Sequence, residues 1–115
     1  MRIYHNTACG TSRTVLGMIR DSGREPEIVE YLKTPLSRDD LVKLLKKLDL
    51  SPREILRRKG TTLEALGLDE AAMSDDAILD AIAAHPILME RPIVVTPETA
   101  RICRPAERVK DLLTP

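Results

Sequence analysis

The sequence has very few aromatic residues. Its 115 residues include two Tyr and neither Phe nor Trp. A hydrophobic core must therefore consist of Leu, Ile, Val and Ala, and recognition of single-stranded nucleic acid by base stacking is disfavoured because it needs aromatic platforms. The formal net charge is zero, which argues against broad attraction to nucleic acid or to an anionic membrane. We expect neither as a partner.

Long apolar runs and cysteine motifs are also missing. No segment has the length of a transmembrane helix, and the chain enters a strand directly at its start without a signal peptide, so a cytoplasmic location is expected. The two cysteines, Cys9 and Cys103, are too few for a disulfide framework and are interpreted as thiols. There is no CxxC motif and no Cys/His cluster with zinc spacing, so no metal site is predicted.

The first part of the chain predicts a βαβ unit. Short strands are expected at Ile3–His5 and Glu27–Tyr31, with an amphipathic helix over Thr11–Asp21 between them. Ser22 and Gly23 are typical of the end of a helix. Two strands joined through one helix are expected to run parallel.

A helical segment follows, and then the pattern returns to strands. Ser37 is a predicted N-cap for a helix with leucines at positions 41, 44, 45 and 48, and shorter helices are expected over 52–58, 62–66 and 74–83. Strands are predicted at 92–95 and 101–103, joined through 96–99, and Pro105 suits the first turn of a final helix that follows Arg104.

This order, βαβ, a helical insertion over about 37–84, then ββα, predicts an α/β fold with a thioredoxin-like mixed sheet. No linker, repeat or low-complexity stretch divides the chain. We therefore expect a single domain over residues 1–115, acting as a monomer.

Cys9 is the strongest candidate for a nucleophile because it lies where the first strand gives way to the helix. A helix N-terminus gathers unpaired N–H groups and the positive end of the helix dipole, which stabilise a thiolate. The same N–H groups, at Gly10 and Thr11, can hold an oxyanion beside the sulfur. The hydroxyls of Thr11 and Ser12 can donate hydrogen bonds to the sulfur.

Two neighbours of Cys9 have more than one interpretation. Ser12 occupies the place where a dithiol redox enzyme carries its second cysteine, so an external thiol such as glutathione would have to resolve Cys9; alternatively, Ser12 is only a hydroxyl at the helix start. His5, if protonated, would add positive charge near the thiolate, or it is a strand-end histidine bonded to backbone.

Three arginines could converge to form an anion site: Arg57, Arg91 and Arg104. The planar guanidinium makes paired, charge-assisted hydrogen bonds to a tetrahedral oxyanion. Arg91 precedes Pro92 and a strand, in a loop that resembles the cis-proline loop facing the nucleophile in thioredoxin folds. Arg57 could instead belong to a solvated basic patch at a helix end. Cys103 could pair with Cys9 but is better explained as a buried thiol.

The chain resembles the glutaredoxin-linked arsenate reductases. The matching segments are His5–Arg13, Ile55–Arg57, His85–Leu88, Glu90–Pro97 and Arg101–Pro105, in order along nearly the whole chain. The sequence differs at Thr7, where that family often has proline.

The resemblance implies a catalytic route. Cys9 would attack arsenate to form a thioarsenate adduct, with Arg57, Arg91 and Arg104 binding the oxyanion and with His5 and Ser12 helping to keep the thiol ionised. Glutathione would act as co-substrate, glutaredoxin would remove it, and arsenite would leave. No tightly bound cofactor is expected.

Two alternatives remain. A related thiol reductase could use Cys9 on another substrate, although such an enzyme would not need three arginines. A redox regulator of the Spx type, which binds RNA polymerase, could present the basic cluster around Arg53, Arg57, Arg58 and Lys59 to its partner. Regulators of that type typically sense oxidation through a CxxC motif, which Ser12 interrupts.

Overall fold

A computed structural model describes residues 1–113, so the last two residues of the predicted domain lie outside the described part. The chain forms two compact units. The first contains Met1–Thr34 and the chain from Arg91 onward, and the second contains Pro35–Glu90. The insertion predicted over about 37–84 lies within the second unit.

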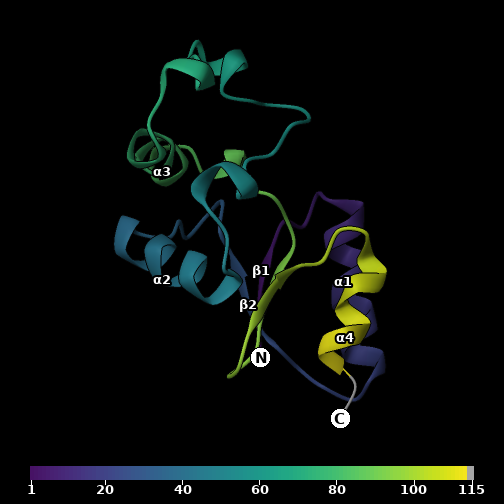
Figure 1. Ribbon diagram of the computed structural model, residues 1–115. Coiled ribbons are helices and arrows are strands. Elements are labelled where there is room, and N and C mark those ends of the chain that lie inside the picture. Colours follow the sequence, from purple (N-terminus) through teal and green to yellow (C-terminus); the bar gives the residue numbers. More distant parts are fainter. Residues whose placement is uncertain (114–115) are drawn as a thin grey trace. The chain divides into compact units, whose positions relative to one another are not determined.

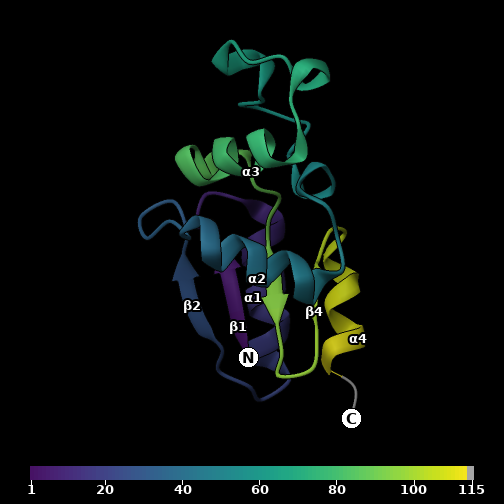
Figure 2. The ribbon, with the colours of Figure 1, turned by 60° about the vertical axis from the view of Figure 1, so that its left-hand side comes forward.

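The first unit is built on a four-stranded mixed sheet (Figure 2). Its strands are β1 (Arg2–His5), β2 (Glu27–Glu30), β3 (Ile93–Val95) and β4 (Ala100–Ile102), in the order β2-β1-β3-β4. β1 pairs with β2 in parallel, and β1–β3 and β3–β4 are antiparallel. The predicted parallel βαβ unit and the later strand pair are therefore confirmed, and the mixed sheet follows from joining them.

Helix α1 (Gly10–Asp21) connects the two parallel strands and carries its apolar residues on one face. Val15, Leu16 and Ile19 recur at helical spacing and are buried. The helix ends as predicted, because the Ser22 N–H bonds to carbonyls of the last turn and Gly23 follows with a left-handed φ of 89°.

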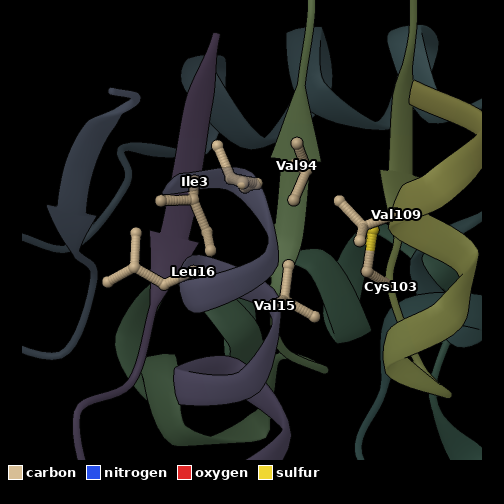
Figure 3. Close-up of a cluster of buried hydrophobic side chains, with 7 residues drawn as sticks. Ile3, Val15, Leu16, Val94, Cys103 and Val109 are labelled. Atoms are coloured by element: carbon tan, nitrogen blue, oxygen red, sulfur yellow. The ribbon is translucent and has the colours of Figure 1, made fainter. Parts of the chain in front are cut away.

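One buried cluster in the first unit is aliphatic apart from one thiol (Figure 3), and the two tyrosines, Tyr4 and Tyr31, are buried outside this cluster. The cluster contains Ile3, Val15, Leu16, Ile19, Val94, Cys103 and Val109. Each fully buried Val, Leu or Ile stabilises the fold by roughly 1.5–3 kcal/mol relative to an exposed side chain. α1 packs beside the C-terminal segment, a 3-10 helix η5 (Ala106–Val109) continued by α4 (Lys110–Leu113) (Figure 1).

The second unit contains α2 (Arg38–Leu48) and α3 (Asp75–Ala84), which pack against each other. Both helices begin at a serine N-cap: Ser37 accepts from the Asp40 N–H, and Ser74 accepts from the Ala77 N–H. Leu41, Leu44 and Leu45 of α2 are buried, as their spacing predicts. No helix in the described part of the chain is long and apolar enough to cross a membrane.

The segment between α2 and α3 differs from the prediction. The helix expected over 52–58 is only a 3-10 turn, η1 (Pro52–Ile55), because Leu56 then forms a β-bridge with Met89. Two further 3-10 turns follow, η2 (Glu64–Leu66) and the unpredicted η3 (Glu70–Ala72), which Asp69 caps through the Ala71 N–H. A last one, η4 (Pro86–Leu88), follows α3. Each is too short for helical periodicity to show.

Replacing Ile19 with Ala should lower the free energy of unfolding by about 2–5 kcal/mol, because the change leaves a cavity in the core. Ile28→Ala removes the same atoms from a side chain that is 37% exposed, so it should cost less than about 1 kcal/mol. Urea unfolding followed by circular dichroism measures both. Equal losses in the two variants would contradict this assignment of the core.

Candidate active site

A four-residue turn delivers Cys9 from the end of β1 to the start of α1. The Cys9 N–H donates to the Asn6 carbonyl at 3.0 Å, and the Ala8 N–H donates to Asn6 Oδ1 at 2.9 Å. Asn6 is buried and shapes the turn through both its backbone and its side chain. Cys9 is therefore the N-cap residue of α1.

The start of α1 is open to an anion. The Gly10 and Thr11 N–H groups occupy the first helical positions, where no intrahelical acceptor exists. The first turn has no acidic residue, whereas α2 and α3 each carry two aspartates there. Anion binding at this helix start is therefore not opposed by a resident carboxylate.

The surroundings of the sulfur favour the thiolate. Burial opposes ionisation and is the largest single influence, but the Ser12 amide N–H, Arg104 and Arg91 together outweigh it and lower the pKa of Cys9. Arg104 Nη1 lies 3.7 Å from Cys9 Sγ. Cys9 is partly exposed, so a substrate can reach this residue.

Arg91 and Arg104 reach the sulfur from the two sides of one hairpin. Arg91 lies just before β3, and Arg104 lies just after β4. Because these neighbouring strands are antiparallel, the start of one and the end of the other meet at the same edge of the sheet. Arg104 Nη1 also donates to the Arg91 carbonyl at 3.1 Å. Both arginines precede a cis proline, which at Pro92 matches the predicted loop.

Ser12 and His5 form a buried pair through their side chains. His5 Nδ1 lies 2.5 Å from Ser12 Oγ, which also accepts from the Asn6 N–H at 3.1 Å. The predicted donation of the Ser12 hydroxyl to the sulfur stays a prediction; the Ser12 amide N–H is the group of this residue that lowers the pKa of Cys9.

His5 differs from the predicted strand-end histidine that bonds to backbone. Its ring bonds to a side chain rather than to backbone. Burial lowers its pKa, and nearby Arg20 and Arg13 add to this effect against the opposing influence of Glu30. A lowered pKa favours the neutral imidazole; the predicted positive charge of His5 near the thiolate stays a prediction.

Arg57 belongs to the second unit, so its convergence on Cys9 stays a prediction. It does not end a helix, since it follows the Leu56 bridge and its N–H donates to the Leu88 carbonyl. Its side chain is 13% exposed and its Nη1 lies 2.9 Å from Glu90 Oε1. It is a nearly buried, ion-paired arginine rather than part of a solvated patch.

Cys103 is a structural thiol. It is fully buried in the core of the first unit, and burial raises its pKa to about 12. Both cysteines are free thiols. No group of His, Cys, Asp or Glu side chains within residues 1–113 could hold a metal ion.

Sequence reasoning missed three residues near the predicted site residues. Asn6 forms the turn described above, Arg13 donates to the Thr7 carbonyl at 2.9 Å, and Glu90 pairs with Arg57. Asn6 carried a usable signal, because asparagine favours tight turns. The partners of Arg13 and Glu90 depend on side-chain direction, which has no signature in the sequence.

The alkylation rate of Cys9 should rise with pH as the thiol ionises, with a midpoint below that of an ordinary thiol. Arg104→Gln should move this midpoint to higher pH, because the cation that favours the thiolate is lost. Iodoacetamide kinetics across a pH series measure the midpoint. Arg108→Gln removes an exposed arginine of η5 and should leave the midpoint of the alkylation rate unchanged. An equal shift in both variants would assign the effect to overall charge.

Native protein treated with iodoacetamide at mildly alkaline pH should carry label on Cys9 and none on Cys103. The Cys103 sulfur is buried and its pKa keeps it protonated. Peptide mass spectrometry locates the label, and a sample unfolded in urea should be labelled at both positions. Native labelling of Cys103 at a comparable rate would show that its part of the core opens readily.

Known proteins are similar to this chain in sequence and in fold. The arsenate reductases of Acidiphilium multivorum and of Escherichia coli strain K12 are each 53% identical to the chain over 111 residues, which is 96% of this chain and 79% of theirs. The solved arsenate reductase from Vibrio cholerae superposes with a TM-score of 0.88 at 39% identity, covering 96% of this chain and 97% of that one.

These likenesses confirm the predicted thioredoxin-like α/β fold and the resemblance seen in the sequence motifs. The segment matching the family begins within β1 and ends within α4. Since residues 4–112 match the ArsC family, this chain belongs to the ArsC family.

Proposed function

We propose that this chain is an arsenate reductase that converts arsenate to arsenite, with Cys9 as its nucleophile. The observation that carries the proposal is the position of Cys9 at the open start of α1, with Arg104 Nη1 3.7 Å from its sulfur and Arg91 also favouring the thiolate. Curated relatives in the same family are arsenate reductases. The site thus combines a thiol whose pKa is lowered with donors for a tetrahedral oxyanion.

The first step is attack of the Cys9 thiolate on arsenic. Arg91, Arg104 and the N–H groups of Gly10 and Thr11 would hold the arsenate oxygens and stabilise their charge. A sulfur–arsenic bond forms as one arsenic–oxygen bond breaks, and that oxygen takes up protons and leaves as water. Arsenic stays pentavalent in this adduct. Arg57 would complete the oxyanion site, as the resemblance implies.

The remaining steps supply two electrons from two external thiols. Glutathione would add to the adduct, forming a second sulfur–arsenic bond as another oxygen leaves as water. A glutaredoxin thiolate would then attack the glutathione sulfur. The two attacking thiols form a mixed disulfide, and the electron pair of the broken bond reduces arsenic to the trivalent state. Hydrolysis of the Cys9–arsenic bond would release arsenite and restore the thiol.

Dependence on external thiols is supported by the lack of an internal resolving cysteine. Ser12 stands where a second cysteine would be, and its hydroxyl is committed to His5 and the Asn6 N–H. Cys103 is fully buried, and its pKa of about 12 keeps it protonated. Neither residue is suited to attack an adduct on Cys9.

The regulator alternative has less support. Its partner-binding cluster would need uncompensated positive charge, but Arg53 and Arg58 both pair with Glu70, and Arg57 pairs with Glu90. A thiol reductase for another substrate remains a competing proposal, and the Arg91 variant below distinguishes it, because a substrate without an oxyanion gains little from that arginine.

Oxidation of NADPH, coupled through glutathione reductase, glutathione and glutaredoxin, should depend on arsenate in the wild type. Cys9→Ser should abolish this rate, and Arg91→Ala should lower kcat/KM for arsenate by about ten- to a hundredfold, because a charge-assisted contact is lost. Cys103→Ala should keep most of the activity. No arsenate-dependent rate in a folded wild type would overturn the proposal, and an active Cys9→Ser would overturn the assigned nucleophile.

A further inference from the structure

We propose that Arg13 binds a carboxylate of the peptide thiol that resolves the Cys9 adduct. This inference rests on the proposed function, because it assigns a binding residue for the reductant at that same site. Arg13 would direct the anionic thiol toward the sulfur, separately from the arginines that bind the arsenate.

The guanidinium of Arg13 is held beside the Cys9 turn. Arg13 lies one helical turn after Cys9, and its N–H donates to the Cys9 carbonyl at 3.0 Å. Side chains on a helix lean toward its N-terminus. The Arg13 side chain accordingly reaches back, and its Nη1 donates to the Thr7 carbonyl at 2.9 Å.

Gly10 leaves this guanidinium uncovered. A Cβ at position 10 would lie 3.8 Å from Arg13 Nη2, so the head group rests against the side of the helix where glycine has no side chain. Arg13 is exposed to solvent. Its position is therefore fixed at one nitrogen, and its outer face is open to a ligand.

Arg13 differs from most arginines of the chain in having no carboxylate partner. Ion pairs bind the guanidinium groups of Arg2, Arg20, Arg38, Arg53, Arg57, Arg58 and Arg101. Within the described residues, the Arg13 guanidinium donates only to the Thr7 carbonyl. A guanidinium has five N–H donors. Most of the donors of Arg13 therefore have no partner in the described part of the chain, although the bond to the Thr7 carbonyl fixes the position of the group.

The position of Arg13 suits a second anion better than the arsenate. Arg91 and Arg104 both lower the pKa of Cys9, whereas the Arg13 guanidinium is held at the Thr7 carbonyl. Arg13 is exposed to solvent, so a separate ligand can reach it. Glutathione carries a carboxylate at each end of a short peptide, so one can reach a neighbouring cation while the thiol approaches the adduct.

The test compares glutathione with its diethyl ester, which lacks both carboxylates, in the coupled assay at saturating arsenate. In Arg13→Gln, the KM for glutathione should rise roughly three- to tenfold, as expected for one exposed charge-assisted contact. The KM for the diester and the KM for arsenate should stay within twofold of wild type. The same glutaredoxin is used with every variant. Its own preference between glutathione and the diester therefore cancels when the KM of each variant is divided by the KM of the wild type.

Three controls sharpen this comparison. Arg24→Gln removes another exposed arginine that donates to a backbone carbonyl, that of Leu113, and should change neither thiol's KM. Arg13→Lys should restore part of the glutathione preference. Added salt should weaken glutathione binding in the wild type more than in Arg13→Gln, because it screens the exposed charge.

The outcomes separate this inference from the proposed function. A similar loss with glutathione and its diester would show that Arg13 only holds the turn at Thr7, and would overturn the inference. An unchanged KM for glutathione in Arg13→Gln would also overturn it. Absence of arsenate-dependent turnover in the wild type with either thiol would overturn the proposed function itself.

Discussion

The unpaired amide groups at the start of α1 are the constraint on which the rest of the site depends. These amide groups stabilise an anion that lies close to the first turn of the helix. Cys9 meets this requirement because it is the N-cap residue, directly before the first helical residue. That position requires a tight turn after β1, and Asn6 supplies it with one backbone and one side-chain acceptor. It also requires a first turn without carboxylates, which distinguishes α1 from α2 and α3.

The helix start alone does not decide the charge of the thiol. Burial is the largest influence on Cys9 and opposes ionisation, so the protein must add cations close to the sulfur. The antiparallel β3–β4 hairpin does this, because its two ends lie at one edge of the sheet and bring Arg91 and Arg104 together. A sheet built from parallel strands alone would place the start and the end of adjacent strands at opposite edges. The mixed topology of the sheet therefore determines which cations lie near the sulfur.

The sequence predicted those features that depend on periodicity and local capping. Leu41, Leu44 and Leu45 show the helical period, and Ser37 and Ser74 cap their helices as serines commonly do. The short 3-10 turns were not predictable in the same way, because three or four residues do not establish a period. At the site, the position of Cys9 followed from a strand-to-helix change, but the direction of the Ser12 hydroxyl depended on His5 and on the fold of the turn.

The distribution of charge explains how a chain of zero net charge can hold an anionic substrate. Most arginines are neutralised by a nearby carboxylate, as Arg57 is by Glu90, so they attract little at a distance. Arg13 and Arg104 instead bond to backbone carbonyls or to the sulfur, and no carboxylate pairs with either among the described residues. A carbonyl fixes the guanidinium without cancelling its charge. Positive charge is thus concentrated around Cys9 by pairing the arginines elsewhere, and the site does not require a basic protein.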